Sequence, residues 1–234
     1  MKIFCLAYAG GDGHVFLPFS QKLEEQGLEL IPFYYRGRGS RQDEGSYQTI
    51  QAAAEDAANF IASFDLSQGY HVLGFSLGAL VTYDLYYALV KRGLPAPNYL
   101  IFCGALPPSH LLKDRLASKE NPGPLLARLE AMGGGITPEL INSPDFQRYF
   151  LPLLINDFKL YEDYIYKPAE QLITSQVRVC YGSQDQYANQ DIKRWQDLVA
   201  SEVEFIEMPG NHFFLFAHQA NYAKVFSGLR GNND

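Results

Sequence analysis

Short apolar runs recur along this chain, separated by longer segments in which apolar residues return with the spacing of a helix. The apolar runs have the length and composition of buried strands, and they cover residues 2–8, 28–33, 70–73, 99–103, 176–181 and 203–208. The segments with helical spacing cover residues 14–26, 49–64, 79–90, 189–200 and 213–229. This alternation predicts an α/β protein with a mostly parallel sheet and helices on both faces.

The alternation stops after residue 106 and resumes near residue 167. The segment 107–166 contains no convincing strand, is broken by proline and glycine, and carries many large apolar side chains between Phe146 and Tyr164. Its position favours a helical insertion that covers one end of the sheet as a lid, whereas a simple packed helical layer is the alternative interpretation. We therefore predict a single domain, with a core of residues 1–106 and 167–234 and a lid of residues 107–166.

Composition excludes several classes of protein. The chain of 234 residues has a formal net charge of −7, which argues against a general nucleic-acid-binding protein. No apolar run is long enough for a membrane span, and the apolar N-terminus is too short for a signal peptide. Cys5, Cys103 and Cys180 lie inside strand-like runs, which favours buried free thiols in a reducing compartment. We expect a cytoplasmic monomer that binds neither nucleic acid nor membranes.

The sequence Gly74-Phe75-Ser76-Leu77-Gly78 lies between a predicted strand and a predicted helix. A G-x-S-x-G in that context predicts a nucleophile elbow, a sharp turn that exposes a serine hydroxyl at the edge of the sheet. The glycines would leave room for the turn, Ser76 would adopt a strained backbone conformation, and the helix N-terminus would favour developing negative charge. A glycine-rich turn that holds an incidental serine is the alternative interpretation.

A serine nucleophile needs a base and an acid that orients the base, and in α/β-hydrolases these follow in the order serine, acid, histidine. Asp185 follows the predicted strand 176–181, and His212 follows the predicted strand 203–208. Catalytic groups gather at the carboxyl ends of parallel strands. We therefore expect Ser76, Asp185 and His212 to meet at one edge of the sheet as a catalytic triad.

A tetrahedral intermediate also needs two N–H donors, which form an oxyanion hole. Leu77, which follows the candidate nucleophile, would supply one, and Ala9, in the glycine loop after the first strand, would supply the other. That loop fits neither a dinucleotide-binding motif nor a P-loop. The histidines are dispersed and the cysteines lie in strands, so we expect no metal and no cofactor.

The remaining acids and histidines are weaker candidates, because they fall within predicted helices, strands or the insertion. The acids are Asp56, Asp84, Asp157, Asp163 and Asp191, of which Asp191 is expected to cap a helix and Asp56 to point outward beside Glu55. The histidines are His14, His71, His110 and His218.

Over nearly its whole length the chain resembles the type II (external, editing) thioesterases of nonribosomal peptide and polyketide synthesis. The matching motifs are residues 5–11 (Cys-Leu-Ala-Tyr-Ala-Gly-Gly), 36–41 (Arg-Gly-Arg-Gly-Ser-Arg), 74–79, 129–134, 157–164, Gly182 with Asp185, and 210–214 (Gly-Asn-His-Phe-Phe). The departures are modest: Phe75 replaces a usual histidine, Arg36 a proline and Asn211 a glycine. None of them removes a catalytic group.

The resemblance implies hydrolysis of acyl thioesters on the phosphopantetheine arm of an acyl or peptidyl carrier protein, which removes stalled or aberrant acyl groups from a synthase. A carboxylesterase or lipase that acts on small free esters is the alternative, because the triad would serve either ester. A non-catalytic binding protein on a hydrolase scaffold is a third hypothesis, disfavoured because no triad member is missing. Lys113, Arg115 and Lys119 of the insertion are candidates to meet an acidic carrier.

Overall fold

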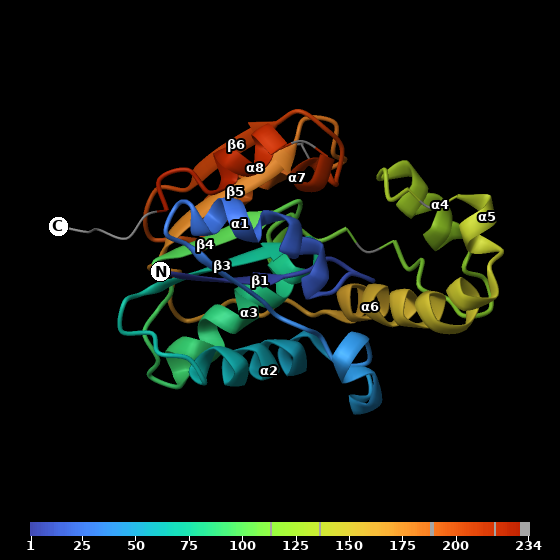
Figure 1. The fold of residues 1–234 in the computed structure, drawn as a ribbon, viewed down its shortest axis with the longest axis horizontal. Helices are drawn as coiled ribbons and strands as arrows, with labels where there is room; N and C mark the ends of the chain where they lie inside the picture. Colours follow the sequence, from blue (N-terminus) through green and yellow to red (C-terminus); the bar gives the residue numbers. More distant parts are fainter. Residues whose placement is uncertain (113, 136, 188–189, 218, 230–234) are drawn as a thin grey trace.

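The computed structural model describes residues 1–112, 114–135, 137–187, 190–217 and 219–229. In this part of the chain one parallel sheet is built from β1 (Lys2–Leu6), β2 (Glu29–Pro32), β3 (Tyr70–Phe75), β4 (Tyr99–Cys103), β5 (Gln176–Gly182) and β6 (Glu204–Met208). The strand order is β2-β1-β3-β4-β5-β6, so all the strands end at the same edge (Figure 1). The predicted parallel sheet is confirmed.

Helices cover both faces of the sheet, as the sequence predicts (Figure 1). One face carries α2 (Ile50–Ala62) and α3 (Leu77–Lys91), and the other carries α1 (Ser20–Glu24), α7 (Phe214–Ala217) and α8 (Gln219–Val225). On the second face the ring of Phe19 stacks on Tyr222, with centroids 4.5 Å apart. None of the described helices combines the length and the apolar character that crossing a membrane requires.

Some helices differ from their predicted form. The segment 14–26 begins as a 3₁₀ helix, η1 (Gly13–Phe19), which contains Pro18, and becomes α-helical only in α1. Proline lacks the N–H that a regular helix needs at that position, which explains the change. Residues 190–198 also form 3₁₀ turns, η5 (Gln190–Leu198), and the predicted start at Asn189 lies outside the described residues. The predicted closing helix is described as α7 and α8, on either side of residue 218, which lies outside the described residues.

Between β4 and β5 the described residues form helices and no strand. These are η3 (Pro108–His110), α4 (Gly123–Ala131), α5 (Pro138–Ile141), the π turn η4 (Phe146–Phe150) and α6 (Leu151–Asp163). Figure 1 shows α6 beside the end of the sheet, with α4 and α5 farther out. The insertion, residues 107–166, has its own apolar cluster, which includes Leu129 and Leu154 and against which Ala9 of the core packs. That the insertion acts as a lid stays a prediction.

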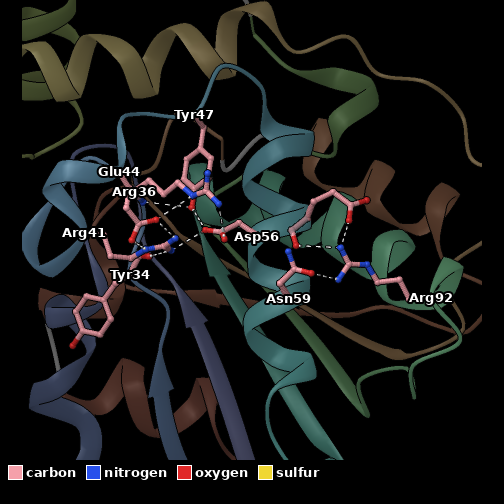
Figure 2. A network of polar contacts seen from close by, with 9 residues as sticks. Tyr34, Arg36, Arg41, Glu44, Tyr47, Asp56, Asn59 and Arg92 are labelled. Carbon is pink, nitrogen blue, oxygen red and sulfur yellow. Dashed lines mark hydrogen bonds and ion pairs between the residues drawn. The ribbon is translucent and has the colours of Figure 1, made fainter.

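A cluster of polar side chains around Asp56 fixes the loop after β2 to α2 (Figure 2). Arg36 and Arg41 donate to the two carboxylate oxygens at 3.1 and 2.8 Å, and the Tyr47 hydroxyl donates at 2.5 Å. Burial alone would raise the pKa of Asp56, but these hydrogen bonds outweigh it and lower the pKa. The prediction that Asp56 points outward is therefore wrong, because its carboxylate is the shared acceptor of the cluster, whereas Glu55 is exposed.

The cysteines are buried free thiols, as predicted. Cys5, Cys103 and Cys180 lie on β1, β4 and β5. Burial raises the pKa of Cys5 and of Cys103 above the ordinary thiol value. Protonated thiols in an apolar core are poor nucleophiles, so these side chains serve packing.

Candidate active site

Ser76 occupies a sharp turn between β3 and α3. Its φ of 55° and ψ of −113° lie outside the regions that side-chain-bearing residues favour. A Cβ on Gly74 would stand 2.3 Å from the Gly78 carbonyl oxygen, and one on Gly78 would stand 2.2 Å from the Leu6 carbonyl oxygen. Only glycine fits at either position. The Ser76 N–H donates to the Cys103 carbonyl at 2.8 Å, which ties the turn to the end of β4.

Asp185 and His212 form a buried pair at the ends of the next two strands. The Asp185 Oδ2 and His212 Nδ1 atoms are 2.8 Å apart, and the two side chains are 0% and 2% exposed. The second carboxylate oxygen, Oδ1, accepts the Tyr187 N–H at 3.1 Å. An ionised carboxylate can only accept hydrogen bonds, so the proton of neutral His212 lies on Nδ1. The Nε2 lone pair is then left to act as a base.

The ring of His212 is packed among other rings and against backbone. The ring centroids of Phe75, Tyr187 and Phe213 lie 5.6, 5.5 and 5.3 Å from it. Gly104 has a φ of +58°, and a Cβ there would come within 3.2 Å of the His212 Cε1 atom. Because Gly104 follows the residue that Ser76 binds, Ser76 and His212 lie beside the same short piece of backbone. Among the described residues, the Ser76 hydroxyl donates no hydrogen bond to His212.

The glycine loop, residues 8–11, follows β1 at the same edge of the sheet. It is closed by a hydrogen bond from the Gly11 N–H to the Tyr8 carbonyl at 2.9 Å. The Gly10 N–H is engaged by Asp157 at 2.7 Å. Neither the Ala9 N–H nor the Leu77 N–H donates to a protein acceptor in the part of the chain that the structure describes. Both candidate oxyanion donors are therefore available.

The rival histidines have other partners. His71 Nε2 lies 2.8 Å from the Leu229 carbonyl, and burial lowers the pKa of His71 to about 4. His14 contacts Asp12, and His110 contacts Ser109. His218 lies outside the described residues.

The rival acids also lie elsewhere. Asp191 is in the first turn of η5, where an acid suits the positive helix end. Asp163 forms ion pairs with Arg115 and Lys159 on the insertion. Asp84, on α3, accepts hydrogen bonds from Gln51 and Tyr164, and burial raises its pKa to about 6.

Arg38 and Asp157 are the residues that sequence reasoning missed. Asp157 was expected within the insertion as an ordinary acid, yet it is buried and forms a bidentate ion pair with Arg38. The pair joins positions 119 residues apart. In the sequence, only one feature points to these two residues: Arg38 lies in the motif 36–41 and Asp157 in the motif 157–164, both of which resemble the thioesterase family.

Two hollows lie near α6. A cavity of about 360 Å³ borders the glycine loop and is lined by Tyr8, Phe150, Leu154 and Phe213, among others. A larger one, of about 580 Å³, lies between α2, α3 and the end of α6 and contains Asp84. The glycine loop lines the smaller cavity and not the larger one, so the smaller one is the candidate substrate pocket.

The chain is similar to known thioesterases. The family model described as Thioesterase domain matches residues 1–229. The medium-chain S-acyl fatty acid synthase thioesterase of Rattus norvegicus is 26% identical over 216 residues, covering 92% of this chain and 81% of the rat protein.

Two solved structures are similar as well. The RedJ thioesterase from the prodiginine biosynthetic pathway in Streptomyces coelicolor is 27% identical with a TM-score of 0.83, over 96% of this chain and 82% of RedJ. YbtT, a type II thioesterase from the yersiniabactin NRPS/PKS pathway, is 27% identical with a TM-score of 0.78, over 96% of this chain and 91% of YbtT.

The parallel sheet, the elbow before α3 and the acid and histidine at the following strand ends define an α/β-hydrolase, and the predicted fold class is confirmed. Within that class, the chain belongs to the thioesterase family. The resemblance that the sequence motifs indicate is thus confirmed, and the protein is a hydrolase of thioesters.

Proposed function

We propose that the protein is a type II thioesterase that hydrolyses acyl groups from the phosphopantetheine arm of carrier proteins and so clears a nonribosomal peptide or polyketide synthase. The family match and the likeness to RedJ and YbtT support this substrate class. The observation that carries the chemistry is the 2.8 Å contact between Asp185 and His212 beside the strained Ser76 turn. A cytoplasmic monomer is part of the same proposal.

In the first half of the reaction, the Ser76 Oγ attacks the thioester carbonyl carbon while His212 Nε2 takes the hydroxyl proton. Asp185 holds the ring in the required tautomer and stabilises its charged form. The N–H groups of Leu77 and Ala9 stabilise the oxyanion of the tetrahedral intermediate. Collapse of the intermediate breaks the carbon–sulfur bond, and His212 returns the proton to the pantetheine thiolate.

In the second half, a water molecule attacks the acyl-enzyme with His212 again as the base. The second tetrahedral intermediate uses the same N–H donors, and its collapse releases the carboxylic acid and restores Ser76. The acyl chain lies in the cavity of about 360 Å³ beside the glycine loop, whose apolar lining suits a hydrocarbon. The insertion acts as the lid over this pocket, and it moves to admit the pantetheine arm.

The deciding experiment compares matched substrates that carry one acyl group. They are the acyl group on a phosphopantetheinylated carrier protein, the same group on a short free thioester, and its ethyl ester. We expect the highest kcat/KM on the carrier-bound thioester and the lowest on the ethyl ester. Preference for the ethyl ester would instead identify a carboxylesterase, and equal rates on the carrier-bound and free thioesters would reject a carrier-directed enzyme.

A further inference from the structure

A buried ion pair joins the insertion to the core. Arg38, from the loop after β2, and Asp157, from α6, have side chains that are only 8% and 1% exposed. The guanidinium donates two parallel hydrogen bonds, from Nη1 to Oδ2 at 2.8 Å and from Nη2 to Oδ1 at 2.7 Å. A bidentate pair of this kind fixes the two side chains in one relative orientation.

Both partners of the ion pair also bind the backbone of the glycine loop. Asp157 Oδ2 accepts the Gly10 N–H at 2.7 Å, and Arg38 Nη1 donates to the Gly11 carbonyl at 2.7 Å. Gly10 has a φ of +80°, and a Cβ there would stand 3.0 Å from Leu154 of α6. The loop is thus held by an N–H and a carbonyl at once, with a helix of the insertion packed against it.

Arg38 is directed into this position by its neighbours in the loop. Arg36 and Arg41 hold the loop on α2 through Asp56 (Figure 2), and Arg38 between them binds Asp157 instead. The ring of Tyr35 lies beneath its guanidinium, with the Cζ atom 5.1 Å from the ring centroid. The three arginines therefore divide into two surface anchors and one buried side chain that reaches the glycine loop.

The bond to Asp157 restrains the backbone next to the candidate oxyanion donor. Ala9 and Gly10 present adjacent N–H groups, and only that of Gly10 has a protein acceptor among the described residues. Rotation of the intervening peptide would break the bond to a buried carboxylate, which is costly because the charge would lose a partner. The carboxylate therefore fixes the Ala9–Gly10 peptide, and Arg38 fixes the carbonyl of Gly11. The Ala9 N–H belongs to the preceding peptide, whose Tyr8 carbonyl accepts the Gly11 N–H at 2.9 Å, so the anchored Gly10 and Gly11 hold that peptide in place through the turn.

We propose that Arg38 and Asp157 are positioning residues for the oxyanion hole, which is complete only while α6 of the insertion is docked on the glycine loop. This inference rests on the proposed function and adds to it, because it makes a part of the insertion necessary to the chemistry and not only to substrate access. Neither side chain touches the reacting atoms. Each acts through the turn of residues 8–11, whose anchored Gly10 and Gly11 orient the Tyr8–Ala9 peptide that carries the Ala9 N–H.

The test uses Asp157→Asn and Arg38→Gln in the full chain. Asparagine keeps the shape of the side chain but replaces one carboxylate oxygen with an N–H₂ group. That donor would face another donor, either the Gly10 N–H or the guanidinium, so one of these hydrogen bonds would be lost. The matched control is Arg178→Gln, because Arg178 is also buried and donates to a carboxylate, on Glu204, and to backbone carbonyls, at Val225 and Ser227. Arg178 lies near the start of β5, at the opposite end of the strand from the site.

For a free acyl thioester, we expect both site variants to lower kcat by ~10- to 100-fold. This loss is smaller than the one caused by removing an oxyanion donor altogether, because the Ala9 N–H is displaced and not lost. KM should change by less than about twofold, because ground-state contacts are kept. The inhibition constant of a trifluoromethyl ketone analogue, which forms an oxyanion on Ser76, should rise by the same factor as kcat/KM falls. The ¹⁵N-resolved Gly10 amide proton should move upfield and exchange faster in Asp157→Asn.

The control separates this effect from a general loss of stability. Arg178→Gln should lower the melting temperature but leave kcat, inhibitor affinity and the Gly10 amide unchanged. Unchanged kcat in Asp157→Asn, or an equal fall of kcat in Arg178→Gln, overturns the positioning role. Failure of the proposed function has a different signature, namely wild-type protein that cleaves no thioester. In that case the Gly10 amide and the rate of Ser76 phosphonylation still decide whether Asp157 positions the loop.

Discussion

The loops of the candidate site are held in two different ways. The loops after β5 and β6 contact each other at the sheet edge, as the Asp185–His212 bond and the close approach of Gly182 to the Asn211 carbonyl illustrate. The turn after β3 is bonded to the end of β4 through the Ser76 N–H. The glycine loop after β1 depends instead on a side chain of the insertion, Asp157. The proposed triad is therefore held mainly by the loops of the sheet, although Gly133 of the insertion also lies against Asn211 beside His212. The proposed oxyanion hole depends on the sheet and the insertion together.

This difference predicts which changes are independent of the insertion. A change in the proposed triad should abolish hydrolysis of every substrate, because carrier-bound and free thioesters would be attacked by the same nucleophile and base. A change that loosens the insertion should act through the glycine loop, the pocket or carrier docking, and should leave the Asp185–His212 pair intact.

The largest expected effect is that of Ser76→Ala. Removing the nucleophile should lower kcat by up to ~10⁶-fold on all substrates, the loss known for a triad serine. A fluorophosphonate should label wild-type protein at Ser76 and leave the variant unlabelled, as peptide mass spectrometry would show. Label on another serine, or near-normal turnover in the variant, would remove Ser76 from the mechanism.

Asp185→Asn should follow, with a fall in kcat of ~10⁴-fold, because an amide favours the wrong tautomer of the histidine. The fold should be kept, since the amide fills the same space. Asp191→Asn is the matched control, because Asp191 lies six positions further on in η5 and its loss should be nearly silent. The reverse pattern in steady-state kinetics would show that Asp191 is the acid.

The two parts of the site also differ in how far the sequence could predict them. Ser76, Asp185 and His212 each follow an apolar run, and parallel strands bring such positions to one edge without any long-range information. The Arg38–Asp157 pair joins two segments whose relative position depends on how the insertion packs. No local pattern encodes that packing. The same limit applies to Asp56, whose burial is set by two arginines of another loop.

Gly104→Ala tests the packing around the base. The new Cβ would stand 3.2 Å from His212 Cε1 at a φ of +58°. We expect kcat to fall by ~10- to 100-fold, because a small displacement of a catalytic group has effects of this size. Gly93→Ala is the control, since Gly93 has a φ of +69° with nothing within 4 Å of the added Cβ. Equal activity in the two variants would show that the His212 ring tolerates the shift.

A smaller effect is expected from Asp84, which binds Tyr164 at the end of α6 and so ties the insertion to α3. Burial raises its pKa to about 6. The folded state therefore binds this proton more tightly than the unfolded chain does, and the stabilisation is present below pH ~4 and lost as the pH rises through ~6. Relative to wild type, Asp84→Asn should gain about 2 kcal/mol of unfolding free energy between pH 4 and pH 7.5.

Urea unfolding at the two pH values measures this difference. The triad is not involved, so kcat on a free thioester at pH 7.5 should match wild type. A difference between Asp84→Asn and wild type that does not depend on pH would show that the carboxyl titrates normally.

The smallest expected effect concerns carrier docking on the insertion. Arg115 is paired with Asp163 at 2.8 Å, Lys119 is exposed, and Lys113 lies outside the described residues. Reversing the three charges should weaken hydrolysis of a carrier-bound acyl group by about fivefold, which corresponds to ~1 kcal/mol at an exposed interface. The loss should be larger at low salt, because screening is weaker there. Turnover of a free thioester should be nearly unchanged.

Single reversals sharpen the prediction. Because Asp163 already balances the charge of Arg115, Lys119→Glu should account for more of the loss than Arg115→Glu. Lys91→Glu is the control, since Lys91 is also exposed but lies at the end of α3 opposite to Ser76. A loss in Lys91→Glu as large as that in Lys119→Glu would point to the net charge of the molecule and not to the insertion.

The triple reversal has two outcomes that contradict the prediction. Equal losses on carrier-bound and free substrates would place the effect in the pocket or the glycine loop. No loss on either substrate would show that the insertion has no role in carrier docking.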